Sequence, residues 1–149
     1  MKFRNIIMLS AALLLALGFT GCSKKDPNQP PEGTPEAAAY AFAQALYSGD
    51  SKSVISQLEL DKQIPSSKDG NDKEKAEIKG KLEASLSRVG KDGENAGGIK
   101  DITVSKAEIS EDGKTAKTNV TVTFNKSKAR PQHESLTLIK LDDKWVVRL

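Results

Sequence analysis

The residues of this 149-residue chain that could do chemistry are few, and the first to consider are its single cysteine, Cys22, and its single histidine, His133. A lone thiol cannot close an internal disulfide, and one thiol with one imidazole falls short of the four ligands of a structural zinc site. The run that begins at Asp69, DGNDKE, lacks the ligand spacing of a calcium loop. The sequence therefore predicts no metal ion and no other cofactor, and it leaves Cys22 as a candidate for covalent attachment.

Cys22 follows an apolar run that has the form of a bacterial export signal. Lys2 and Arg4 precede the run, which extends from Ile6 to Leu17, and small residues stand directly before the cysteine. At about 1.5 Å per helical residue, the run is too short to cross a hydrocarbon core of about 30 Å. We therefore expect residues 1–21 to be removed as a signal peptide.

The four residues FTGC, Phe19 to Cys22, resemble the bacterial lipoprotein signal, in which a peptidase cuts before a cysteine whose thiol carries a diacylglycerol. The resemblance implies cleavage between Gly21 and Cys22 and a lipid (diacylglycerol, with a further acyl chain such as palmitate) on Cys22. Two or three acyl chains hold a protein firmly on a bilayer, so the membrane is an expected partner. The alternative is an ordinary secretory signal followed by an incidental thiol.

The residues after the cysteine bear on the location of the protein. Gram-negative lipoproteins retained at the inner membrane commonly carry an aspartate directly after the cysteine, whereas this chain has Ser23. The resemblance thus implies the outer membrane, facing the periplasm, with the outer face of the cytoplasmic membrane as the alternative. Residues 22–33 are polar and rich in proline, which predicts a stiff tether before a single folded domain over residues 34–149.

Four polar residues are candidates for a pocket: Tyr40, Tyr47, Asp101 and His133. Tyr40 and Tyr47 are seven residues apart and would share one side of a helix, whereas Asp101 and His133 fall in strand-like runs. A carboxyl, imidazole or phenol group in an apolar pocket can act as an acid or base. Residues of these types at such positions are more commonly ordinary core or surface residues, so no catalytic residue is assigned.

Helices are predicted in the first half of the folded region. Thr34 can cap a helix that ends at Gly49, and Asp50 can cap a short second helix. After a polar stretch over 61–71, apolar residues at helical spacing predict a third helix from about Asp72 to Val89, followed by a glycine-rich connection. The apolar stripe of the third helix consists of Ile78, Leu82, Leu86 and Val89.

After the third helix the apolar period changes from 3.6 to 2, which predicts strands. Four runs have this character, over residues 99–110, 115–125, 133–141 and 144–149. In the last of them, Trp145, Val147 and Leu149 are expected to face the core. Helices followed by an antiparallel meander predict an α+β fold, with three helices packed on a curved four-stranded sheet.

The charge of the chain argues against nucleic acid as a partner. Of 23 basic side chains, Lys2 and Arg4 lie in the signal, which leaves 21 against 20 acidic ones. Binding to phosphates requires basic residues gathered on one face. The densest basic segment is NKSKAR, Asn125 to Arg130, and three cations between two strands are typical of a solvated turn.

Two segments, TPEAAAYAFAQALYSGD and LIKLDDKWVVRL, resemble a family of small bacterial lipoproteins of unknown function whose domain has the cone-shaped fold of nuclear transport factor 2 and ketosteroid isomerase. The resemblance covers residues 34–149 and implies this fold more than any activity. Domains of this fold often dimerise through the outer sheet face, so a homodimer is one expected assembly.

Two functions remain open. The first is a non-enzymatic, lipid-anchored envelope protein that binds another envelope protein or a small apolar ligand. The second is an enzyme of the isomerase or dehydratase type, whose acid or base would come from the four pocket candidates. The two are distinguished by whether those polar groups converge at the bottom of an apolar cavity.

Overall fold

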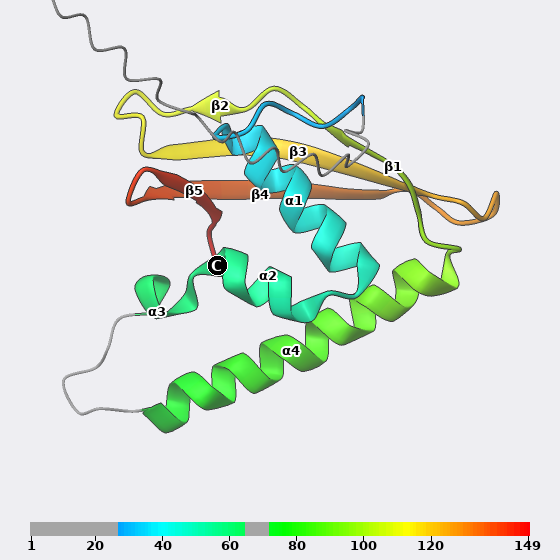
Figure 1. Cartoon of the computed structure of the whole chain (residues 1–149), viewed down its shortest axis with the longest axis horizontal. Helices are drawn as coiled ribbons and strands as arrows, with labels where there is room; N and C mark the ends of the chain where they lie inside the picture. The colour runs from blue at the N-terminus through cyan, green and yellow to red at the C-terminus, as the bar shows by residue number, and fades with distance from the viewer. Residues whose placement is uncertain (1–26, 65–71) are drawn as a thin grey trace, which may run out of the picture.

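A curved antiparallel sheet with helices on one face forms the part of the chain that the computed structural model describes, residues 27–64 and 72–149 (Figure 1). The elements follow the order α1 (Pro35–Ser48), α2 (Ser51–Leu58), α3 (Leu60–Gln63), α4 (Asp72–Asn95), β1 (Ile99–Val104), β2 (Glu108–Ile109), β3 (Thr115–Phe124), β4 (Gln132–Leu141) and β5 (Lys144–Val147). The strand order is β1-β3-β4-β5, and the short β2 pairs with β3 beyond the end of β1. The predicted α+β fold is confirmed.

The core lies between the sheet and α1. Alternate residues of β3 point toward the helix and are buried, from Ala116 through Val120 and Val122 to Phe124. Leu138 of β4 pairs with Ala116 and is fully buried on the same face. α1 and α2 contact the strands, whereas α4 packs mainly against α1 and α2 (Figure 1).

α1 begins and ends at the residues that the sequence indicated. The Thr34 hydroxyl accepts a hydrogen bond from the N–H of Ala37 at 3.2 Å, and Pro35 occupies the first turn. Gly49 ends the helix with a φ of 79°, in the left-handed region that favours glycine. Glu36 accepts from the N–H of Ala107 at 2.7 Å and so attaches the start of the helix to the segment between β1 and β2.

The predicted end of the third helix is wrong. α4 continues past Val89 to Asn95 and contains Gly90 and Gly93. A Cβ at Gly90 would overlap the backbone of Gly49, and a Cβ at Gly93 would overlap the carbonyl oxygen of Tyr47. These two glycines therefore allow the backbones of α1 and α4 to approach closely instead of ending the helix.

Other boundaries also differ from prediction. The run over residues 99–110 is divided into β1 and β2, and the start of the polar stretch forms the single turn α3. In β5 Val146 and Val147 are buried and Trp145 is half-buried. Leu149 lies beyond the end of the strand and is 57% exposed, so its predicted inward position is wrong. The side chain of Gln63 accounts for this, because it bonds the carbonyl of Val147 and the N–H of Leu149 and holds the chain end along α3.

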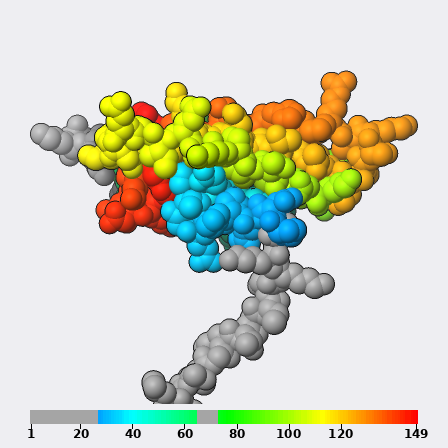
Figure 2. Space-filling model, turned by 90° about the horizontal axis from the view of Figure 1, so that it is seen from above, coloured from blue at the N-terminus to red at the C-terminus, as the bar shows by residue number. Residues whose placement is uncertain are grey.

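The end of the predicted tether lies against the domain. The Asn28 side chain donates to Asp101 Oδ1 of β1 at 2.7 Å. Figure 2 shows the first described residues, in blue, beside β1, in green. Gly21 and Cys22 lie outside the described residues.

Candidate functional site

A groove of about 370 Å³ opens where the last turn of α1, the last turns of α4 and the connection from β3 to β4 meet. Its apolar lining comes from all three, with Leu46 on α1, Val89 on α4, and Phe124 and Ala129 on or after β3. Tyr47 and Glu134 supply polar groups from α1 and β4. The groove therefore combines apolar walls with a small number of polar atoms, as ligand sites do.

Glu134 occupies an inward position of the sheet. It pairs with Val120, which is fully buried, and opposite residues of an antiparallel pair share a face. Its neighbours in phase along β4, Leu136 and Leu138, contribute to the core. The fold thus brings a carboxyl group to the end of an otherwise apolar inner face, where it is half-buried.

Tyr47 binds this carboxyl group. Its Oη donates to Glu134 Oε1 at 2.7 Å, and its ring meets Phe124 edge to face, with centroids 5.7 Å apart and planes at 69°. Burial raises the pKa of the Tyr47 phenol far above its usual value, and the hydrogen bond and the negative charge of Glu134 raise it further. At neutral pH Tyr47 is therefore a fixed donor rather than a base.

The raised pKa predicts a loss of stability in alkali. A phenol that ionises more readily when unfolded contributes stability that is complete below pH 10, the unfolded value, and is lost as the pH rises above it. Between pH 10 and 12 we expect the free energy of unfolding to fall with a slope that increases toward about 1.4 kcal/mol per pH unit as the unfolded phenol becomes fully ionised. Urea unfolding at a series of pH values should show this extra slope in the wild type and not in Tyr47→Phe. An identical slope in both proteins would contradict it.

The four pocket candidates do not converge. Tyr47 lines the groove, whereas Tyr40 is 4% exposed within the core between α1 and the sheet. Asp101 lies on β1 opposite Thr123, with its side chain bound by Asn28 and Thr103. His133 is exposed on the outer face of the sheet, since its neighbour Glu134 faces inward, and its Nδ1 lies 3.0 Å from the Thr121 hydroxyl.

Three charged residues of the groove, Asp92, Arg130 and Glu134, are not among the candidates that the sequence indicates. Glu134 had a detectable signal, because it stands in phase with Leu136 and Leu138 and so takes an inward position in the predicted strand. Arg130 belongs to the segment that the sequence predicts as a solvated turn; its side chain is exposed and also borders the groove. Asp92 fell beyond the predicted end of its helix.

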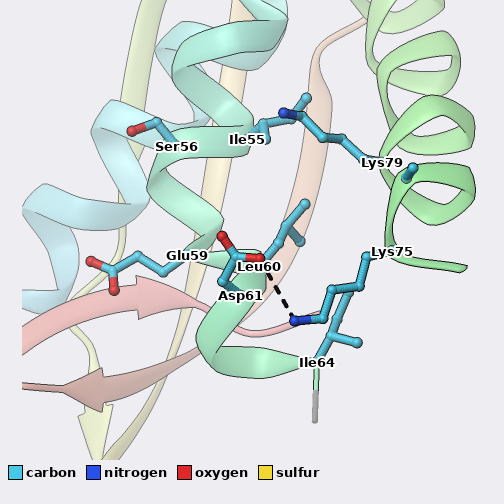
Figure 3. Close-up of a pocket in the computed structure, with 9 residues that line it drawn as sticks. Ile55, Ser56, Glu59, Leu60, Asp61, Ile64, Lys75 and Lys79 are labelled. Carbon is cyan, nitrogen blue, oxygen red and sulfur yellow. Dashed lines mark ion pairs between the residues drawn. The ribbon is translucent and has the colours of Figure 1, made fainter. Parts of the chain in front are cut away.

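A second groove, of about 310 Å³, separates α2 and α3 from the first half of α4 (Figure 3). Ile55, Leu60 and Ile64 line one side of it, and Lys75 of α4 lies 3.9 Å from Asp61 across it. Residues 65–71, between α3 and α4 in the sequence, lie outside the described residues. Within the lining of the groove Lys75 pairs with Asp61, and Glu59 pairs with Lys62 and Lys144 outside it, so these charged groups already have partners.

The described residues show neither a metal-binding cluster nor a membrane-spanning helix. Over residues 27–64 and 72–149, no group of three or more His, Cys, Asp or Glu side chains is placed to hold a metal ion. No helix within these ranges is both long enough and apolar enough to span a bilayer.

Comparison with known proteins identifies similar chains. The family model described as Domain of unknown function (DUF4878) matches residues 29–148. The structure is similar to a 2.00 Å crystal structure of a Campylobacter jejuni protein provisionally named an NTF2-like transpeptidase, where NTF2 is nuclear transport factor 2. The two chains are 33% identical with a TM-score of 0.65, over 78% of this chain and 98% of the other. A search of the curated proteins gives no match.

Proposed function

The chain belongs to the DUF4878 family and has the nuclear transport factor 2-like fold, and from this premise we propose that it is a lipid-anchored, non-enzymatic binding protein of the bacterial cell envelope. In this proposal Cys22 carries the anchor and the groove beside Tyr47 and Glu134 receives the ligand. The observation that carries the proposal is the half-buried Tyr47–Glu134 pair at the open end of an apolar inner face.

The enzyme alternative has less support. An isomerase or dehydratase of this fold would need two of the four pocket candidates in one apolar cavity, and only Tyr47 lines the groove. Transpeptidation, which the name of the Campylobacter jejuni protein suggests, needs an activated nucleophile. Among the described residues an imidazole meets a hydroxyl at His133 and Thr121, on the outer sheet face and away from the groove.

The contact at Asn28 limits the reach of the proposed anchor. Asn28 is six residue steps after Cys22, and at about 3.3–3.6 Å a step the two span roughly 20 Å when extended. A lipid on Cys22 would therefore hold the domain near the bilayer, with β1 and the start of α1 toward it. We propose that the protein lies on the outer membrane facing the periplasm, with the outer face of the cytoplasmic membrane as the alternative.

The anchor can be tested by removing the thiol. In cells labelled with a radioactive fatty acid, Cys22→Ser should abolish the label and leave the signal uncut by the lipoprotein peptidase, because no diacylglycerol can be attached. Ser23→Asp is the matched control, which should keep the lipid but shift the protein from the outer to the inner membrane fraction. Unchanged labelling and processing of Cys22→Ser would contradict the anchor.

The binding function can be tested by photo-crosslinking in intact cells. A photoreactive residue at the exposed groove position Gln132 should form an adduct, whereas one at Lys117, exposed on the outer sheet face, should not. An adduct of dimer mass from Lys117 alone would instead support the homodimer through the sheet face. Equal capture from both positions would contradict a groove-specific ligand.

A further inference from the structure

Glu134 carries a charge that the described part of the fold does not neutralise. Its Oε1 accepts from the Tyr47 hydroxyl, which is itself neutral. Within residues 27–64 and 72–149, no Lys, Arg or His nitrogen lies within 4.0 Å of the Glu134 carboxylate. The second oxygen of this partly buried carboxylate is open to a donor, and an ammonium group entering the groove would form a charge-assisted hydrogen bond there.

The other charges of the groove are also without ion pairs. Arg130, in the connection from β3 to β4, and Asp92, on α4, both line it, and within the described ranges neither lies within 4.0 Å of an opposite charge. The groove thus presents two carboxylates and one guanidinium that form no ion pair with one another. A ligand carrying both an ammonium and a carboxylate would complement this set.

The remaining lining sets the size and nature of the ligand. Leu46, Val89, Phe124 and Ala129 are apolar, and the volume of about 370 Å³ is near the lower end of the range of about 300–1,000 Å³ for small-molecule sites. We propose that this groove binds a small zwitterion with an apolar side chain, such as an aliphatic amino acid, with its ammonium at Glu134 and its carboxylate at Arg130. The inference rests on the proposed binding function and adds the class of ligand.

The test uses the full chain purified in detergent and three probes of similar shape. Leucine has both charges, leucinamide only the ammonium, and N-acetylleucine only the carboxylate. Binding is followed by the NMR shift of the Ala129 amide. We expect leucine to bind about tenfold more tightly than N-acetylleucine, because acetylation removes the charge that meets Glu134.

Two variants assign the charges to their partners. Glu134→Gln should remove the preference for leucine over N-acetylleucine, and its amide oxygen can still accept from Tyr47. Arg130→Gln should remove the preference for leucine over leucinamide. Glu108→Gln, which removes an exposed carboxylate of β2 outside the groove, should change neither, and thermal unfolding checks that all variants fold.

Three results would overturn the inference. They are equal binding of leucine and N-acetylleucine, a preference that persists in Glu134→Gln, and no shift with any probe up to about 10 mM, where even a millimolar site would be filled. If the probes fail while the crosslink at Gln132 remains specific, the ligand class is wrong and the binding function stands. If both fail, the proposed function fails as well.

Discussion

Gly93→Ala is expected to lower the free energy of unfolding by about 2–3 kcal/mol or more. Gly93 is buried in α4 at the crossing with α1, where an added Cβ would overlap the carbonyl oxygen of Tyr47. A backbone oxygen cannot turn aside as a flexible side chain does, so the two helices must separate. The separation would also displace Tyr47 from Glu134, and ligand binding in the groove should be lost with the stability.

Gly80→Ala provides the matched control for this prediction. Gly80 lies in the same helix, and a Cβ there would meet nothing within 4 Å. Alanine should therefore stabilise α4 by about 0.5–1 kcal/mol, the usual difference in helix propensity. Urea denaturation of both variants checks the pair. A Gly93→Ala protein as stable as the wild type would show that the helices do not need this close approach.

The glycines of α4 illustrate what local sequence could not reveal. Gly90 and Gly93 follow the last apolar residue of the stripe, where glycines commonly end helices. They are distinguished from helix-ending glycines by their partners, Gly49 and Tyr47, which lie more than 40 residues earlier in the chain. No pattern within α4 carries that information, so the predicted helix ended too early.

Where a pattern is local, prediction succeeded. Thr34, Pro35 and Gly49 define α1 through hydrogen bonds and backbone angles within one turn of each end. The alternation of β3 follows directly from its sequence, because one face is buried and the other is not. The nuclear transport factor 2-like fold predicted from two short segments is confirmed.

The groove was predictable only in part. Tyr47 was a candidate because of its type, and Glu134 is visible as a charge at an inward strand position. The contact between Tyr47 and Glu134 is not visible in the sequence, because the two residues are 87 positions apart and only the packing of α1 across the sheet brings them together. Asp101 and His133 were candidates for the pocket because of their side-chain types. The register of their strands places both on the side of the sheet that faces away from the groove.

The apolar stripe of α4 leads to the second large prediction. Sequence spacing makes Ile78 and Leu86 equivalent, since they are eight residues apart and share one helix face. In the structure Leu86 is 7% exposed within the core cluster, whereas Ile78 is 36% exposed. The difference arises because the later turns of α4 pack on α1, which crosses them at the two glycines.

Leu86→Ala should therefore lower the free energy of unfolding by about 2–4 kcal/mol, because it removes buried apolar area and leaves a cavity at the junction of α1 and α4. Ile78→Ala should cost less than about 1 kcal/mol, since little area is lost and alanine favours the helix. Urea denaturation with a shared slope measures both. Equal losses would contradict the prediction and would mean that the whole stripe of α4 is buried alike.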